Sequence, residues 1–151
     1  MNPFIPCISA FIACIGFSFI FRVHENFRFA IAGSLIGALG YLIYLLCNFM
    51  SNTFLQTFLA MLSVALFAEA LARLYKAPAS IFVIIGCFPL VPGSGIYYTM
   101  LYAVEGEEAL FINSLLSTLG ISLSIAFAIL ISSTMIDIYR RIKSKHYEPI
   151  A

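Results

Sequence analysis

The sequence predicts an all-α integral membrane protein with about five transmembrane helices. Its 151 residues are 62% hydrophobic and only 10% charged, whereas a soluble domain carries roughly 25% charged residues. The eight basic and seven acidic side chains fall into four short groups. The stretches between these groups are long enough to cross a bilayer, which takes about 20 helical residues. A soluble domain of this length has too little interior for so much apolar surface, whereas lipid solvates it.

The apolar stretches define the expected spans and make residues 1–151 a single membrane domain. The first stretch is predicted to be a span and not a signal peptide, because no Lys or Arg precedes it and no small-x-small cleavage site follows it. The expected spans cover approximately residues 4–21, 29–47, 54–72, 78–104 and 109–136, and residues 137–151 form a basic cytoplasmic tail.

The basic residues set the expected orientation. With five spans and the N-terminus outside, the inner segments are residues 22–28, 73–78 and 137–151, and they contain all eight Lys and Arg residues. The acidic EGEE turn, residues 105–108, then lies outside. Because cytoplasmic loops carry an excess of basic residues, we expect a multi-pass membrane protein with an outside N-terminus and a cytoplasmic C-terminus.

The fourth apolar stretch is interrupted by PLVPGSG. This run contains four helix breakers, which are Pro89, Pro92, Gly93 and Gly95. Proline lacks a backbone N–H, and glycine adopts conformations closed to other residues. We therefore expect a crossing helix that unwinds near the bilayer midplane. A re-entrant hairpin is rejected because it would move the basic tail outside. A structural kink that merely fits neighbouring helices is the alternative to a substrate or gating role.

Unwound backbone in the membrane predicts a cavity at the break. Free N–H and C=O groups are tolerated there only where they are buried in protein or line a water-filled cavity. The half-helix that starts near Gly95 would present its N-terminus to this cavity, and such an end attracts a carboxylate. The candidate substrate or gating residues of the break are Pro89, Pro92, Gly93, Ser94 and Gly95.

The fifth span carries a polar stripe. Asn113, Ser117, Gly120 and Ser124 are spaced by four, three and four residues, so they share one helix face. Their side chains can hydrogen-bond a polar solute or, as is commoner, a neighbouring helix. Asn113, Ser117 and Ser124 are therefore further candidates for solute contact.

Glu69 and Arg73 are one helical turn apart near the inner end of the third span. An i,i+4 ion pair explains them structurally, and a coupling role is the alternative, because carboxylates in membranes are often functional. No titratable side chain is expected at the midplane. Either Glu69 reaches inward, or the coupling residues belong to another chain.

The sequence predicts no metal or cofactor site and no enzyme. None of the four cysteines forms a CxxC pair, and neither His24 nor His146 has metal-ligand spacing to them. HExxH, GxSxG and paired intramembrane aspartates are absent. A net charge of +1 gives no indication of nucleic-acid binding. In the second span, Gly33, Gly37 and Gly40 predict close helix packing.

Residues 70–106, ALARLYKAPASIFVIIGCFPLVPGSGIYYTMLYAVEG, resemble the C-terminal membrane domain of the threonine/serine exporter (ThrE) family. The matching pieces are ARLYKAPA, PLVPG, the tyrosine that follows and the closing EG. The motif residues are Pro89, Leu90, Val91, Pro92, Gly93 and Tyr97, which adds Tyr97 to the candidates. Some members are long chains with two membrane halves, and others are split. The resemblance therefore implies that this chain is the small half, with a larger membrane subunit as its partner.

The resemblance also implies export of small polar metabolites, threonine and serine in some members and succinate in others. We expect the small subunit of a two-component exporter of carboxylate-bearing metabolites, either threonine and serine or a succinate-type dicarboxylate. Two alternatives stay open: a self-sufficient homo-oligomeric channel or carrier, and a non-transporting membrane adaptor.

Overall fold

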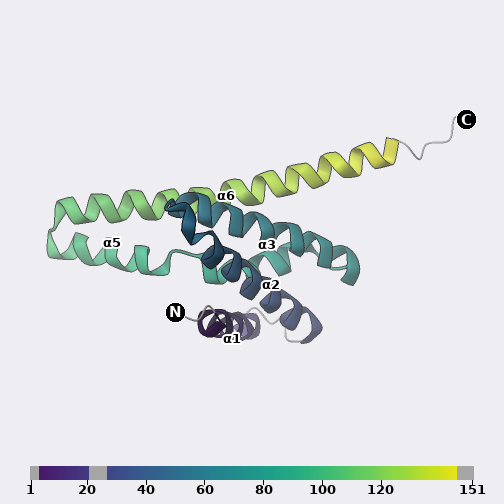
Figure 1. Cartoon of the computed structure of the whole chain (residues 1–151), viewed down its shortest axis with the longest axis horizontal. Helices are drawn as coiled ribbons and strands as arrows, with labels where there is room; N and C mark the ends of the chain where they lie inside the picture. Colours follow the sequence, from purple (N-terminus) through teal and green to yellow (C-terminus); the bar gives the residue numbers. More distant parts are fainter. Residues whose placement is uncertain (1–3, 21–26, 146–151) are drawn as a thin grey trace, which may run out of the picture.

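The computed structural model describes residues 4–20 and 27–145, and this part of the chain is helical without any strand (Figure 1). The helices are α1 (Phe4–Ile20), α2 (Phe27–Leu46), α3 (Thr53–Tyr75), α4 (Ala79–Cys87), α5 (Gly93–Glu105) and α6 (Glu108–Lys145). Short 3-10 helices follow α2 at Cys47–Met50 and α4 at Phe88–Leu90. The predicted all-α membrane class is confirmed.

Among the described residues, three helices are long and apolar enough to cross a membrane: Phe27–Met50, Thr53–Tyr75 and Glu108–Tyr139. The pair Ala79–Leu90 and Gly93–Glu105, bent by 56°, makes a fourth candidate span. The 17 residues of α1 form about 26 Å of helix, less than the roughly 30 Å of a hydrocarbon core. Figure 1 shows α1 nearly end-on, across the direction of α2, α3 and α6. The count of five spans and the outside N-terminus stay predictions.

Helices α3 and α6 run side by side in the same direction (Figure 1). The Phe54 ring lies against Gly120 near one end of the pair. The guanidinium carbon of Arg73 lies 6.0 Å from the ring centroid of Tyr139 near the other end. Residues 108–119 of α6, about 18 Å of helix, therefore extend past the start of α3.

Helix α5 packs antiparallel against this extension of α6, and we call the pair, residues 93–119, the α5–α6 hairpin. Gly106 turns the chain with a left-handed backbone at φ 77°, and its N–H donates to the Tyr102 carbonyl oxygen. Only glycine adopts this conformation without steric cost. The hairpin projects beyond the turn between α2 and α3 (Figure 1).

The two ends of α3 are capped by residues in the short connections to its neighbours. Asn52 caps α3, because its side-chain oxygen accepts hydrogen bonds from the backbone N–H groups of Phe54 and Leu55 at 3.1 and 3.4 Å. Lys76 ends α3 in a left-handed conformation, and Pro78 precedes the first turn of α4. These caps fix where α3 begins and ends, so its connections to α2 and α4 are short.

The core lies between α2, α3 and α4 and is closely packed along the glycines of α2. A Cβ on Gly37 would lie 2.7 Å from the Cys14 sulfur, and a Cβ on Gly40 would clash with Val64. The close packing predicted for this stripe is confirmed. Other core residues include Ile36, Ala60, Met61, Ala68 and Phe82.

The described charges gather at two ends of the helix bundle. The basic end contains Arg28 at the start of α2, Arg73 and Lys76 at the end of α3, and Arg141 late in α6. The acidic end is the EGEE turn between α5 and α6. Arg22, His24 and residues 146–151 lie outside the described residues.

Candidate functional site

The break in the fourth candidate span is built by its own sequence. Phe88–Leu90 form a 3-10 turn with Pro89 at its start, and Val91 is extended at φ −63° and ψ 130°. The Gly93 N–H donates to the Val91 carbonyl oxygen at 2.8 Å, and the Ile96 N–H donates to the Pro92 carbonyl oxygen at 3.1 Å. The chain therefore leaves α4, turns and restarts as α5, as the breakers in PLVPGSG predict.

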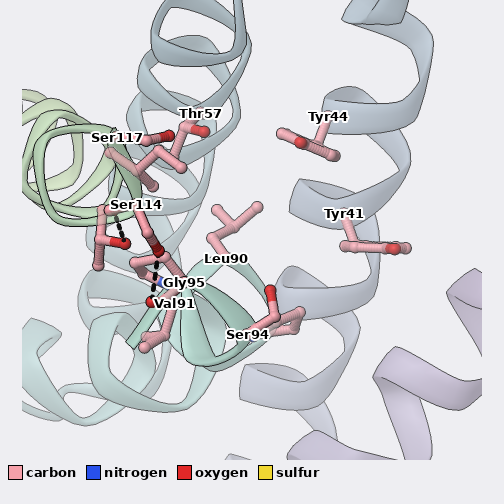
Figure 2. Close-up of a pocket in the computed structure, with 13 residues that line it drawn as sticks. Tyr41, Tyr44, Thr57, Leu90, Val91, Ser94, Gly95, Ser114 and Ser117 are labelled. Atoms are coloured by element: carbon pink, nitrogen blue, oxygen red, sulfur yellow. Dashed lines mark hydrogen bonds between the residues drawn. The ribbon is translucent and has the colours of Figure 1, made fainter. Parts of the chain in front are cut away.

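A pocket of about 420 Å³ opens at this break, between α2, α3, α5 and α6 (Figure 2). It is lined by Tyr41, Tyr44, Thr57, Pro89, Leu90, Val91, Pro92, Ser94, Gly95, Ser114, Ser117, Thr118 and Ile121. Seven of these thirteen side chains carry a hydroxyl group and none carries a charge. The pocket therefore offers hydrogen bonds to a polar solute and no side chain for an ion pair.

Two hydroxyls, those of Thr99 and Ser114, tie α5 to α6 beside the pocket, and a third, that of Thr118, bonds within α6. The Ser114 Oγ lies 2.9 Å from the Thr99 Oγ1 and donates to the Gly95 carbonyl oxygen at 3.3 Å. Thr99 also donates to that oxygen, at 2.7 Å, and Thr118 donates to the Ser114 carbonyl oxygen at 2.7 Å. Figure 2 shows the bond from Ser114 to Gly95 at one wall of the pocket. These hydroxyls hold the wall in place.

Gly95 brings the first turn of α5 directly onto α6. A Cβ at this position would clash with the Thr118 hydroxyl, whereas a Cβ on Gly93 would meet nothing within 4 Å. The first turn of α5, through Ser94 and Gly95, lines the pocket. Because the start of a helix carries about half a positive charge and free N–H donors, this wall is suited to a carboxylate.

Only some of the predicted site residues line the pocket. Pro89, Pro92, Ser94, Gly95 and Ser117 line the pocket, whereas Gly93, Tyr97, Asn113 and Ser124 are not among its lining residues. Ser124 donates to the Gly120 carbonyl oxygen of its own helix at 2.8 Å. Tyr97 is 63% exposed, and its ring packs edge-on against Tyr98.

The α6 face turned to the pocket differs from the stripe expected from spacing. It consists of Ser114, Ser117, Thr118 and Ile121, so Ser117 alone is shared with that stripe. A spacing of three, one and three residues also defines a helix face, and this signal in the sequence was missed. Nothing in the local sequence indicates that Tyr41 and Thr57, on two other helices, reach the same pocket.

The pocket lies near the ends of α2 and α3 that are closest to the acidic end of the bundle, away from the middle of either helix. Thr57 is only four residues after the first residue of α3, and Tyr44 is two residues before the last residue of α2. The break lies beside these ends because the α5–α6 hairpin extends past the α2–α3 turn. The expected position of the break near the bilayer midplane stays a prediction.

Glu69 and Arg73 lie in a separate cavity of about 320 Å³ at the basic end, together with Ala72, Ala77, Pro78 and Ala79. Glu69 is half-buried. It is twelve residues from Thr57 along α3, or about 18 Å of helix. The coupling candidates are therefore far from the pocket at the break. Within residues 4–20 and 27–145, no group of three His, Cys, Asp or Glu side chains is arranged to hold a metal ion.

Comparison with known proteins agrees with these features. The family model described as threonine/serine exporter, ThrE, matches residues 6–135. The match covers the broken span, the α5–α6 hairpin and most of α6. No curated protein and no solved structure matches the chain. Because the family match extends over most of the chain, this protein belongs to the threonine/serine exporter (ThrE) family of membrane transporters.

Proposed function

We propose that this chain is the small membrane subunit of a two-component exporter, and that the pocket at the break of the fourth span binds the exported solute. The observation that supports this most is the lining of the pocket, with seven hydroxyl-bearing side chains and no charge. The first turn of α5 attracts a carboxylate, and the hydroxyls bond the remaining polar groups. The substrate is threonine, serine or a succinate-type dicarboxylate.

The volume of the pocket supports a small solute. About 420 Å³ falls within the range of about 300–1,000 Å³ typical of small-molecule sites. Ser94 and Ser117 are exposed in the pocket. The Ser114 hydroxyl instead bonds α6 to α5, and the Thr118 hydroxyl donates to the Ser114 carbonyl oxygen within α6. Ser94 and Ser117 are therefore the proposed solute-binding hydroxyls.

The α5–α6 hairpin is the surface on which we place the larger partner subunit. Its helices expose apolar side chains beyond the start of α3, among them Met100 at 66%, Val104 at 87% and Leu116 at 62%. The partner would cover these side chains in place of the lipid that otherwise solvates them. The pocket lining also contains no titratable carboxylate or amine to couple transport to an ion. Such a group at the pocket would come from the partner, because Glu69 lies about 18 Å away along α3.

The orientation that we propose puts the acidic end outside and the basic end in the cytoplasm, as in the positive-inside rule. The pocket then lies nearer the outer face, beside the α2–α3 turn. The protein would sit in the inner membrane of a bacterium, with its C-terminus in the cytoplasm.

Deletion of the chain tests the exporter role. A strain that lacks this chain but retains its partner should accumulate threonine, serine or succinate, and the tagged chain should co-purify with a larger membrane protein. Unchanged efflux in the deletion strain would contradict the proposal. Flux through vesicles that contain this chain alone would instead support the self-sufficient homo-oligomer.

Ser117→Ala tests the pocket itself. Removing one hydrogen bond to the solute should raise the half-saturating solute concentration about fivefold, because such a bond contributes about 1 kcal/mol. Ser133→Ala is the matched control, since Ser133 is exposed on the same helix and donates to the Leu130 carbonyl oxygen at 3.0 Å. Equal transport by the two variants in proteoliposomes would exclude a solute contact at Ser117.

Pro92→Ala separates a transport element from an adaptor. The substitution removes a breaker at the start of α5 and should lower flux strongly while the chain still binds its partner. An adaptor would retain full flux as long as the complex assembles. Co-purification with the partner verifies that the complex is intact.

A further inference from the structure

A groove of about 490 Å³ runs between α2 and α3 and shares no lining residue with the pocket at the break. We call it the α2–α3 groove. It is lined by Arg28, Ile31, Ala32, Leu35, Ile36, Leu39, Phe67, Ala70, Leu71 and Tyr75. Leu35 is 53% exposed and Phe67 46% exposed, so the groove opens sideways, toward the lipid.

The groove has the length of one bilayer leaflet. Its α2 residues follow one helix face from Arg28 to Leu39, a distance of about 16 Å along the helix. One leaflet is half of the roughly 30 Å hydrocarbon core. The groove is deep at Ala32 and Ala70, because their small side chains leave space between the two helices.

The inner wall of the groove is fixed by the core. Ile36 is 3% exposed. The Tyr75 ring packs edge-on against Phe29, with ring centroids 5.5 Å apart, and lies 6.1 Å from the Phe82 ring. Phe29 and Phe82 are themselves in edge contact at 5.7 Å. The groove is therefore a feature of the packed bundle.

The charge in the groove lies at one end only. Arg28 is the single charged residue of the lining, and it belongs to the basic end together with Arg73 and Lys76. Beyond Arg28 the stripe along α2 is entirely apolar up to Leu39. An apolar helix of another subunit would fill the apolar stripe but would offer no anionic group to the cation at its end. An acyl chain that ends in an anionic headgroup matches both parts.

We propose that the α2–α3 groove binds one anionic phospholipid, with an acyl chain along the apolar stripe and the phosphate of the headgroup beside Arg28. The positive-inside rule assigns this lipid to the cytoplasmic leaflet, whose anionic lipids attract basic residues at the membrane surface. The site is separate from the pocket at the break, so lipid binding does not depend on the identity of the transported solute.

Tryptophan fluorescence tests the lipid site directly, because the chain contains no tryptophan. Phe67→Trp places a reporter in the groove of the full chain, in vesicles that mix phosphatidylcholine with phosphatidylglycerol. Bromine on the acyl chains of one lipid at a time quenches the reporter. We expect phosphatidylglycerol to occupy the groove about fivefold more strongly than phosphatidylcholine. Equal quenching by the two lipids would overturn the proposal.

Phe127→Trp is the matched reporter outside the groove. Phe127 is 55% exposed on α6 and should show no preference between the two lipids. A reporter at Phe67 that neither brominated lipid quenches would also overturn the proposal, since a second copy of the chain would then cover the groove. The bromines occupy the same acyl positions in both lipids, so the comparison does not depend on reporter depth.

Two substitutions in the Phe67→Trp chain identify the determinants of binding. Arg28→Gln removes the cation and should abolish the preference, whereas Ala70→Leu fills the groove and should reduce quenching by both lipids. Lys76→Asn is the charge control, because Lys76 has the same charge at the same end, does not line the groove and has a left-handed backbone that asparagine accepts. An equal loss of preference in Lys76→Asn and Arg28→Gln would overturn the site in favour of diffuse surface attraction.

Discussion

Gly95 shows how a single residue shapes the pocket. Its missing side chain allows α5 to touch α6 at Thr118, and its carbonyl oxygen accepts hydrogen bonds from Thr99 and Ser114. The adjacent Gly93 has free space around it. The two glycines of PLVPGSG therefore have different roles, one in helix packing and one in the start of the helix.

Gly95→Ala should destabilise the protein by about 2 kcal/mol, because overpacking forces the two helices apart. The thermal unfolding of the purified protein in detergent measures this, and flux should fall as the pocket wall moves. Gly93→Ala is the control and should leave the unfolding temperature unchanged. Equal unfolding temperatures for the two variants would contradict the contact between Gly95 and Thr118.

Ser114 should contribute to stability more than other serines of α6. Ser114→Ala removes a hydroxyl that bridges two helices and should cost about 1 kcal/mol. Ser124→Ala removes a hydroxyl that bonds only within its own helix and should be nearly neutral. Unfolding of both variants in detergent measures the difference, and a larger loss in Ser124→Ala would contradict the assignment.

At the scale of elements, α4 and α5 form a bent pair, the fourth candidate span, which continues into the α5–α6 hairpin. The 56° bend follows from the breakers between them, and the turn to α6 depends on Gly106. The hairpin extends beyond the α2–α3 turn because α6 continues for about 18 Å past the start of α3. This extension places the pocket beside the ends of α2 and α3.

Gly106→Ala tests the turn of the hairpin. A side chain at φ 77° should cost about 1 kcal/mol, since left-handed backbone is unfavourable for L-residues. A Cβ at Gly106 would meet nothing within 4 Å, so the effect reports backbone strain alone. Gly16→Ala is the control, because Gly16 lies inside α1 with free space around it. It should be neutral or stabilising in the same unfolding measurement.

For the whole molecule, the separation of basic and acidic ends links the fold to the membrane. Arg28, Arg73, Lys76 and Arg141 gather at one end, and the EGEE turn lies at the other. Helices α3 and α6 run parallel, and both end at the basic end. Their basic residues therefore gather there.

An epitope tag inserted between Glu107 and Glu108 should be accessible from outside intact cells, whereas a C-terminal tag should become accessible only after permeabilisation. The positive-inside rule predicts both results. A tag at the N-terminus tests the fifth span, since outside exposure requires that α1 crosses the membrane. Cytoplasmic exposure of the Glu107–Glu108 tag would reverse the proposed orientation.

The break was the part of the site that local sequence predicted best. Pro89 and Pro92 act through backbone chemistry that is independent of context, so their effect is visible without a fold. Ser114 and Thr118 were not predicted, although they lie near Ser117, because the choice among faces of α6 depends on where α5 packs. The expected stripe through Asn113 and Ser124 was built on spacing alone.

The sequence by itself determined the helical membrane class, the two charged ends and the interruption at PLVPGSG. Composition, charge spacing and helix breakers act locally or through lipid, so they need no knowledge of neighbouring helices. Only the tertiary structure decided which hydroxyls share a pocket, how far the α5–α6 hairpin extends and that a groove opens between α2 and α3. Those features depend on contacts between residues far apart in the chain, such as Phe54 with Gly120 and Gly95 with Thr118.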